Sequence, residues 1–422
     1  METRLHPLFE PRASGQCGSL PESGAVARLI YMRPDGIGDA VLSNCLLSAL
    51  PELYPGAEII VVCDAASEAV FAASPLPDRV ITLRKSALQD DAYLERVSEE
   101  LRCLKADLLF NAVLSPSRAA AALMLGLDIP ILSLSVNTAN MAPADRERFL
   151  ERVDFLVPVQ AGVRLEIDRY TEMLRRLGLK HGCSAPRLWL APENEEAAAE
   201  TLRRHALPEG AFIALFAAGG MWEKGYTAYG EALAETCLRE GLAVAALGAE
   251  ADRELNEQNV RVLKERGVHA VNLCENGSLL RDAALLRFCR LAVGADTALA
   301  HMACALGVPL VVLVSGSLFG RFFPYQAGTT AVCLPLSCAG CEGRCRYERP
   351  FCMTRIHPAT VREAVNYALA SADGEREKTL YLQNPALWPA GPGLPVWQSP
   401  GDFIRVYKKA PDVPLRVVVA KA

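Results

Sequence analysis

The sequence predicts an α/β protein that is built from two consecutive, doubly wound parallel sheets. Short apolar runs alternate with amphipathic stretches along most of the 422 residues, a pattern typical of strands and helices joined by right-handed crossovers. The alternation starts again after a loop that is punctuated by Pro186 and Pro192. The strand candidates are nearly continuous in apolar residues, as expected for parallel strands that are covered on both faces.

The first half of the chain is expected to alternate strands with helices in this way. Its short apolar runs predict strands at Arg28–Met32, Glu58–Cys63, Arg79–Leu83, Asp107–Ala112, Ile129–Leu134 and Asp154–Val157. The amphipathic stretches between them predict helices at Ala40–Leu50, Tyr93–Leu104, Ser117–Leu125 and Leu165–Leu177.

The second half repeats the alternation. Its expected strands are Phe212–Phe216, Val244–Leu247, Val268–Leu273, Leu291–Val293 and Leu310–Val314. Its expected helices are Asn194–His205, Ala228–Glu240, Ala251–Glu265, Leu279–Phe288, Thr297–Leu306 and, after a Cys-rich loop, Thr360–Ala370.

These elements divide the chain into four regions. We expect a disordered leader at 1–25, an N-terminal domain at 26–185, a C-terminal domain at 186–370 with a Cys-rich loop at 333–357, and a tail at 371–422. The leader lacks the apolar core of a secretory signal. Ligands of such sheets bind at the carboxyl ends of the strands, and a substrate is expected in a cleft that the two domains face.

Composition narrows the function further. Apolar residues make up 51% of the chain and charged residues 22%, which excludes wholesale disorder. The formal net charge of −5 gives no global attraction for nucleic acid or an anionic membrane. No apolar run reaches the roughly 20 residues that span a bilayer. The 14 cysteines lie mostly in apolar segments, which favours a reduced, cytoplasmic protein over a disulfide scaffold.

The first candidate site is the turn Gly36-Ile37-Gly38-Asp39, which follows the first expected strand. Two glycines between a strand and a helix let backbone N–H groups face a ligand, and the helix N-terminus favours negative charge. The third glycine of a dinucleotide-binding turn is missing. A tight turn with Asp39 as a helix N-cap is the structural alternative.

Two further candidate sites lie in the second half. A small-residue loop that contains Gly219 and Lys224 follows the strand at 212–216; backbone donors and one ammonium suit a diphosphate, although a solvated lysine is the alternative. Asp296 and Thr297 follow the strand at 291–293, and His301 lies in the next helix. Asp296 could bind a ribose hydroxyl and Thr297 a phosphate; a helix cap and a core histidine are the alternative.

Together, the three motifs resemble the family-9 glycosyltransferases, which are the lipopolysaccharide heptosyltransferases. That family has a Gly-x-Gly-Asp turn, a later Lys-x-Trp-Pro-like segment, and an Asp-Ser/Thr-Gly-x-x-His motif followed by Ala-x-Gly-x-Pro. This chain has the turn at 36–39, the second segment at 224–227, the third motif at 296–301 and Ala-Leu-Gly-Val-Pro at 305–309, and the likeness covers roughly residues 28 to 365. The resemblance implies the GT-B architecture, which has two Rossmann-like domains with the nucleotide sugar bound mainly by the second.

The resemblance also implies roles for individual residues. Asp39 would be the general base that takes the acceptor hydroxyl's proton, and Lys224 would stabilise the departing diphosphate. The residues expected around the nucleotide sugar are Gly36, Gly38, Gly219, Asp296, Thr297, Ala298 and His301. Side chains and helix dipoles can do the charge work in such a site, so we expect no catalytic metal.

This sequence departs from the family pattern at two places. Ala298 replaces the usual glycine of the third motif, which puts a close backbone approach to phosphate in doubt. Tyr226 and Thr227 replace the usual Trp and Pro beside Lys224, which changes the packing there but keeps an aromatic ring. Neither departure removes a charged group.

The Cys-rich loop predicts a second kind of site. Cys338, Cys341, Cys345 and Cys352 lie within fifteen residues in a loop with little apolar pattern, which fits a thiolate site for structural zinc or iron. Some proteins that resemble this family, the autotransporter-modifying heptosyltransferases, carry an iron-binding finger. Free thiols or a facultative disulfide are the alternative.

The sequence therefore favours an inverting glycosyltransferase that moves a sugar, with ADP-heptose as the expected donor, onto a lipopolysaccharide core acceptor. The alternatives are a protein (autotransporter) heptosyltransferase, a nucleotide-sugar epimerase of the same fold, and a nucleotide-binding regulatory protein without turnover. We expect a glycolipid or glycan acceptor and no nucleic acid. Association with the inner face of the cytoplasmic membrane and an oligomeric state are left open.

Overall fold

The computed structural model describes residues 22–134, 143–157, 165–183, 185–217, 224–275, 279–371, 377–388, 395–396, 399, 403 and 415–421. The chain divides into two compact units. Unit 1 comprises Met1–Val163 and Ile167–Trp189, and unit 2 comprises Arg164–Glu166 and Leu190–Ala422. Most of the predicted leader lies outside the described residues, and its last part forms a 3-10 turn at Ser23–Ala25.

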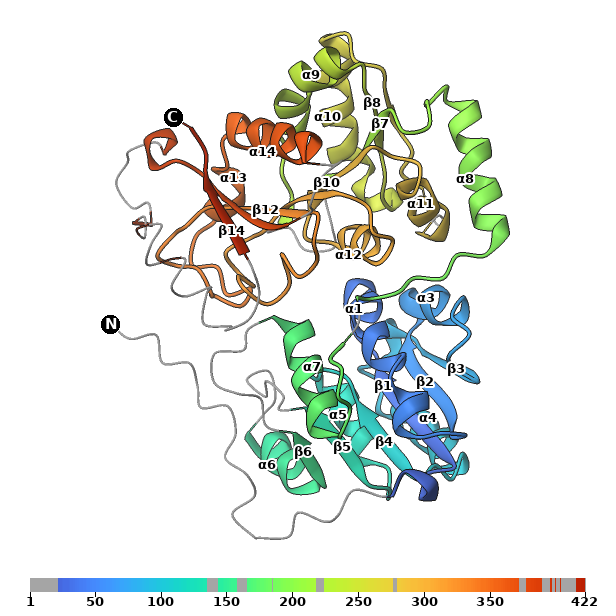
Figure 1. Ribbon diagram of the computed structural model, residues 1–422. Coiled ribbons are helices and arrows are strands. Elements are labelled where there is room, and N and C mark those ends of the chain that lie inside the picture. The colour runs from blue at the N-terminus through green and yellow to red at the C-terminus, as the bar shows by residue number, and fades with distance from the viewer. Residues whose placement is uncertain are drawn as a thin grey trace. The chain divides into compact units, whose positions relative to one another are not determined.

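Unit 1 is a parallel sheet flanked by helices (Figure 1). Its strand order is β3-β2-β1-β4-β5-β6. The strands are β1 (Arg28–Arg33), β2 (Glu58–Asp64), β3 (Arg79–Leu83), β4 (Leu108–Asn111), β5 (Ile131–Leu134) and β6 (Phe155–Val157). The helices are α1 (Ile37–Leu47), α2 (Leu50–Leu53), α3 (Glu68–Ala72), α4 (Asp91–Cys103), α5 (Arg118–Leu125), α6 (Pro143–Arg152) and α7 (Glu166–Arg176), with 3-10 turns at Ala65–Ser67 and Lys85–Ala87.

Strand β1 lies at the point of unit 1 where the strand order reverses. It pairs in parallel with β2 on one side and with β4 on the other. Successive side chains of a strand point to opposite faces, so Ile30 and Met32 join the core beneath α4, α5 and α6. On the opposite face, the Tyr31 hydroxyl donates to the backbone carbonyl of Ser43 in α1 at 3.0 Å. The carboxyl end of β1 is therefore the expected place for a ligand site in this unit.

Unit 2 is a larger parallel sheet whose strand order is β14-β13-β12-β11-β10-β7-β8-β9. The strands are β7 (Phe212–Phe216), β8 (Ala243–Ala246), β9 (Ala270–Asn272), β10 (Leu291–Ala295), β11 (Leu310–Leu313), β12 (Thr329–Cys333), β13 (Lys378–Leu382) and β14 (Leu415–Val419). The helices are α8 (Pro192–Arg204), α9 (Tyr229–Glu240), α10 (Arg253–Glu265), α11 (Leu279–Leu286), α12 (Ala298–Ala305), α13 (Phe351–Thr354) and α14 (Pro358–Ala370), with 3-10 turns at Glu250–Asp252 and Pro385–Leu387.

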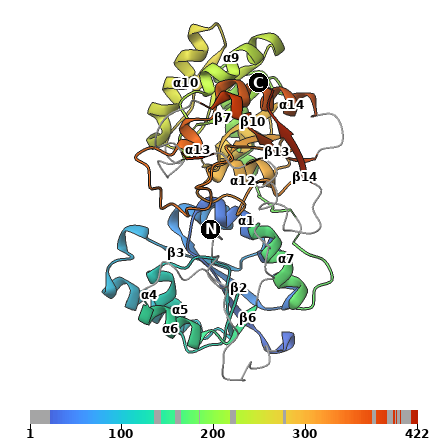
Figure 2. The same ribbon diagram turned by 90° about the vertical axis from the view of Figure 1, so that its left-hand side faces the viewer.

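The core of unit 2 is a sheet that is buried on both faces. Helices α9, α10 and α14 pack together over the face formed by Ile213, Leu215 and Val244, and Figure 2 shows these helices on one side of the sheet. Helices α8, α11 and α12 form a second contacting group. Fully buried strands such as Phe212–Phe216 explain the continuous apolar runs of the sequence.

The two predicted doubly wound sheets are confirmed, but some elements are not those expected. The sequence analysis expected no strand after Leu310–Val314, whereas β12, β13 and β14 extend the sheet of unit 2. Two of these strands come from the predicted tail and run parallel to β12. Helix α6 was also not expected, because its sequence is mostly polar. Among the described residues, no helix has both the length and the apolar character needed to cross a membrane.

Candidate active site

The Gly36–Asp39 turn connects β1 to α1 in unit 1. Helix α1 begins at Ile37, and its N-cap is Gly36 in an extended conformation. Asp39 is therefore in the first turn of the helix, where the dipole stabilises a carboxylate, and the alternative that Asp39 is the N-cap is wrong. Gly38 is the second residue of the same turn.

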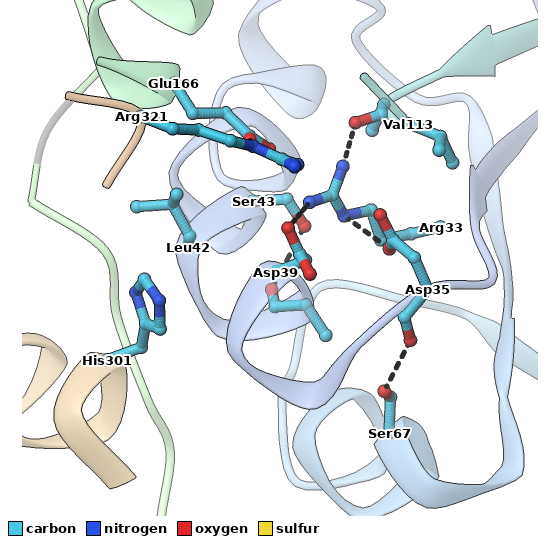
Figure 3. A network of polar contacts seen from close by, with 12 residues as sticks. Arg33, Asp35, Asp39, Leu42, Ser43, Ser67, Val113, Glu166, His301 and Arg321 are labelled. Carbon is cyan, nitrogen blue, oxygen red and sulfur yellow. Dashed lines mark hydrogen bonds and ion pairs between the residues drawn. The ribbon is translucent and has the colours of Figure 1, made fainter. Parts of the chain in front are cut away.

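Arg33 was not among the site residues expected from the sequence; it is the last residue of β1 and lies directly behind this turn. The Arg33 side chain is fully buried. Its Nε lies 3.0 Å from Asp35 Oδ1, and its Nη2 lies 3.3 Å from Asp39 Oδ1. Its Nη1 donates to the backbone carbonyl of Ala112, which follows β4. Figure 3 shows the guanidinium between these groups. An arginine that ends an apolar strand and precedes two acids is the signal that could have found it.

The absence of a side chain at Gly36 leaves room for the Asp39 carboxylate. A Cβ atom at this position would lie 2.9 Å from Asp39 Oδ2, which is closer than ordinary contacts allow. The Ser67 hydroxyl also donates to the backbone carbonyl of Asp35 at 3.5 Å (Figure 3). A side chain at Gly36 would therefore displace the Asp39 carboxylate, while Ser67 contacts the Asp35 backbone.

In unit 2, Lys224 contacts Asp296 twice. The Lys224 ammonium donates to the backbone carbonyl of Asp296 at 2.7 Å and lies 3.3 Å from its carboxylate oxygen Oδ2. Asp296 directly follows β10, so both groups lie at the carboxyl end of that strand. The side chains are 13% and 3% exposed, respectively. Lys224 is therefore fixed by an ion pair, and the alternative of a solvated loop lysine is wrong. Gly219 lies outside the described residues.

The Asp296 carboxylate is held in its ionised form. Burial alone would raise its pKa, but Lys224 and His301 together outweigh that effect and lower the pKa to about 2. The Nε2 of His301 lies 3.7 Å from Asp296 Oδ1. A carboxylate with this pKa is an acceptor at any physiological pH and can hold a hydroxyl donor such as a ribose.

His301 is enclosed by aromatic rings. Its side chain is 3% exposed, and its Nδ1 lies 3.2 Å from the Tyr325 hydroxyl. Its ring also contacts those of Phe322 and Phe323, with centroids at 5.2 and 4.6 Å. This arrangement suits a side chain that orients Asp296 better than one that reaches a ligand directly.

The start of α12 presents a buried hydroxyl. Thr297 is the N-cap of this helix and Ala298 is its first residue. The Thr297 hydroxyl oxygen is buried and has no hydrogen-bond partner within the part of the chain that the structure describes. Buried hydroxyls nearly always have a hydrogen-bond partner, and a helix N-terminus favours anions. A phosphate oxygen bound here would accept a hydrogen bond from the Thr297 hydroxyl and would place negative charge at the start of α12.

The four cysteines of the predicted metal site are each partly exposed. Burial raises the pKa of the Cys352 thiol to about 11, and the other three thiols add to the rise while a backbone hydrogen bond from Gly316 opposes it. Across the described ranges, however, no three His, Cys, Asp or Glu side chains are placed to share a metal ion. The thiols as placed do not form a finished metal centre, so metal binding here stays a prediction.

Comparisons with known proteins agree with the fold and the motifs. A family model described as glycosyltransferase family 9 (heptosyltransferase) matches residues 146–350. No curated protein matches the chain. A family-9 glycosyltransferase from Veillonella parvula has a similar structure, with a TM-score of 0.68 and 21% identity over 82% of this chain and 98% of that one.

Two solved Escherichia coli enzymes are also similar. The ADP-heptose lipopolysaccharide heptosyltransferase II has a TM-score of 0.62 and 20% identity over 82% of this chain and 100% of that one. The heptosyltransferase WaaC with ADP-2-deoxy-2-fluoro heptose has a TM-score of 0.57 and 15% identity over 82% and 99%. At these identities the likeness establishes the fold, which is the GT-B architecture.

Proposed function

We propose that this glycosyltransferase, whose residues 146–350 match the family model described as glycosyltransferase family 9 (heptosyltransferase), transfers a heptose from ADP-heptose to a lipopolysaccharide core sugar with inversion at the anomeric carbon. The observation that carries the proposal is the group formed by Lys224, Asp296 and Thr297 at the carboxyl end of β10. It combines one cation, one ionised carboxylate and an unsatisfied hydroxyl at a helix N-terminus.

Each of these three groups matches a part of a nucleoside diphosphate sugar. The Lys224 ammonium has three N–H donors. Two acceptor atoms of Asp296, its backbone carbonyl oxygen and Oδ2, lie near this ammonium, so the third N–H can donate to a diphosphate oxygen. The Thr297 hydroxyl and the start of α12 suit a second phosphate oxygen. Asp296 can accept a hydrogen bond from a ribose hydroxyl. The same cation then stabilises the charge that grows on the departing diphosphate.

In unit 1, Asp39 is proposed as the general base. The acceptor oxygen forms a bond to the anomeric carbon while the bond from that carbon to the diphosphate oxygen breaks. The acceptor's hydroxyl proton passes to the Asp39 carboxylate, and the diphosphate leaves with the bonding electron pair. The Asp39 side chain is 22% exposed and so can reach an acceptor.

The proposed class of acceptor is taken from the name of a similar protein. Heptosyltransferase II of E. coli acts on lipopolysaccharide by its name, and we propose the same class of acceptor here. Transfer to a protein side chain is the alternative, and epimerisation of the donor is an outcome that the transfer assay distinguishes. A location in the cytoplasm or at the inner face of its membrane would suit a lipopolysaccharide acceptor.

The Cys-rich loop is proposed to hold structural zinc or iron. The placement of four cysteines within fifteen residues of one loop supports this. Binding would require the loop to tighten around the ion and the thiols to lose their protons. Such a metal would order the loop and take no part in transfer.

The experiment that tests the proposed function is a transfer assay with a panel of nucleotide sugars. The purified protein is incubated with ADP-, GDP- and UDP-linked sugars and heptose-free lipopolysaccharide core, and nucleotide release and acceptor mass are followed. We expect ADP-heptose to be the preferred donor. A second sugar nucleotide that appears without nucleotide release would indicate an epimerase, and binding without turnover would indicate a regulatory protein.

A further inference from the structure

Arg33 lies where the two halves of the unit 1 sheet meet. It ends β1, which is paired with β2 and β4, and its Nη1 donates to the backbone carbonyl of Ala112 directly after β4. The side chain is fully buried, whereas the Asp35 and Asp39 side chains that contact it are 25% and 22% exposed. The guanidinium therefore lies behind the two carboxylates, and the carboxylates are the groups that an acceptor can meet.

The position of the Asp39 carboxylate depends on Arg33 and on Gly36. Arg33 Nη2 lies 3.3 Å from Oδ1, while Oδ2 occupies the space next to Gly36 that a side chain would fill. The planar guanidinium has donors at fixed angles, so it can contact Asp35, Asp39 and Ala112 at once only in one orientation. Moving Arg33 would therefore move the Asp39 carboxylate.

The chemistry of Arg33 restricts it to holding other groups in place. Because the guanidinium stays protonated at any pH that proteins tolerate, it cannot itself exchange protons with a substrate.

We propose that Arg33 is the positioning residue of the general base: it holds the Asp39 carboxylate, together with Asp35, in the direction from which the acceptor is deprotonated. This inference rests on the proposed role of Asp39. It predicts a larger effect on the chemical step than on donor binding, because Arg33 contacts the proposed base, whereas the proposed diphosphate contacts come from Lys224 and Thr297.

The test compares Arg33→Met, Arg33→Lys, Asp35→Asn and Asp39→Asn by steady-state kinetics. The probes are ADP-heptose and heptose-free lipopolysaccharide core, with water as the acceptor in a parallel reaction. Misplacing a reacting group by about 1 Å costs on the order of a hundred-fold in rate. We therefore expect Arg33→Met to lower kcat about ten- to a hundred-fold with the KM for ADP-heptose within twofold of wild type. Arg33→Lys should recover part of the loss, because it keeps the charge but cannot bridge two carboxylates.

Arg28→Gln is the matched control. Arg28 begins the same strand, and its Nε lies 2.5 Å from Glu58 in a half-exposed ion pair, so its removal should leave kcat unchanged. The Asp35→Asn variant should lose less activity than Asp39→Asn. In Asp35→Asn, Arg33 can still contact the Asp39 carboxylate, so the proposed base is still present and still held.

Each outcome is decisive. Wild-type kcat in Arg33→Met, or a rise in the KM for ADP-heptose as large as the fall in kcat, would overturn the positioning role while leaving Asp39 as the base. If Arg33→Met does not fold, wild-type kcat in Arg33→Lys has the same meaning. Full activity in Asp39→Asn would instead refute the proposed base, and a larger loss in Asp35→Asn than in Asp39→Asn would transfer that role to Asp35.

Discussion

The Lys224 ammonium lies 2.7 Å from the backbone carbonyl oxygen of Asp296 and 3.3 Å from its carboxylate, although the two residues are 72 positions apart in the chain. The contact joins the segment after β7 to the carboxyl end of β10, and these two strands are neighbours in the sheet. A buried ion pair of this kind is costly to break, because removal of one partner leaves an uncompensated charge. The Lys224–Asp296 pair therefore contributes both to the stability of unit 2 and to the proposed donor site.

Replacing Lys224 should weaken donor binding and turnover together. The diphosphate is charged before the reaction and more so as it leaves, and a charge-assisted contact contributes on the order of 1.5–3 kcal/mol. We expect Lys224→Ala to lower ADP affinity about ten- to a hundred-fold by calorimetry, and Lys224→Arg to lower it less. Lys264→Ala, which removes an exposed lysine of the same unit, is the control. Unchanged ADP affinity in Lys224→Ala would show that Lys224 supports Asp296 alone.

The pKa of Asp296 predicts how the stability of unit 2 changes in acid. The folded pKa of about 2 lies below the ordinary value of 3.8, so the ionised form stabilises the fold. This contribution is complete above about pH 4 and is lost as the pH falls through about 2. The free energy of unfolding of wild type relative to Asp296→Asn should therefore shrink by roughly 2 kcal/mol between pH 6 and pH 2. Denaturant titrations at several pH values measure this difference.

The same titrations in a Lys224→Ala background provide the check. Without the ammonium, burial raises the pKa of Asp296 with less opposition, so the pH-dependent difference should become smaller or reverse in sign. A difference that is the same in both backgrounds would show that Lys224 does not stabilise the Asp296 carboxylate.

Gly36→Ala should impair catalysis through Asp39. The backbone of Gly36 has a φ of −64°, which alanine adopts without strain, but the new Cβ would lie 2.9 Å from Asp39 Oδ2. The carboxylate must therefore move, and we expect steady-state kinetics to show a fall in kcat of at least tenfold. Gly24→Ala is the control, since its Cβ would meet no atom within 4 Å. Wild-type kcat in Gly36→Ala would show that the carboxylate position is not critical.

The Cys-rich loop makes a prediction about metal content. Protein that is purified under reducing conditions should contain about one equivalent of zinc or iron if Cys338, Cys341, Cys345 and Cys352 bind one ion. Cys341→Ser should then lose the metal and lower the melting temperature, with ADP affinity intact. Cys103→Ser, at an exposed cysteine of unit 1, should change neither. Metal analysis without zinc or iron would leave these cysteines as ordinary thiols.

The sequence predicted the buried strands best. Strand β7 was expected at Phe212–Phe216 and is found there, because all five of its residues are buried and the apolar run is unbroken. Strand β12 was missed although it too is buried, since Thr329 and Thr330 interrupt its apolar pattern. Strands β13 and β14 obtain their conformation from pairing with neighbours that are distant in the chain, and local composition does not report such pairing.

The candidate site, too, was predicted only in part. The positions of Asp39, Lys224 and Asp296 at the carboxyl ends of strands follow from the order of the motifs, because parallel strands end at one edge of their sheet. The contact between Lys224 and Asp296 and the burial of Arg33 do not follow from it. Both depend on which strands are neighbours, and so they required the three-dimensional structure.

The most direct test of the central claim is the mass of the acceptor after incubation with ADP-heptose. Wild-type protein and heptose-free lipopolysaccharide core should give an acceptor that is heavier by one heptose residue, with one ADP released for each transfer, and Asp39→Asn should give neither at a comparable rate. An acceptor of unchanged mass, in a reaction where another nucleotide sugar is transferred or ADP-heptose is only bound, would contradict the proposed function.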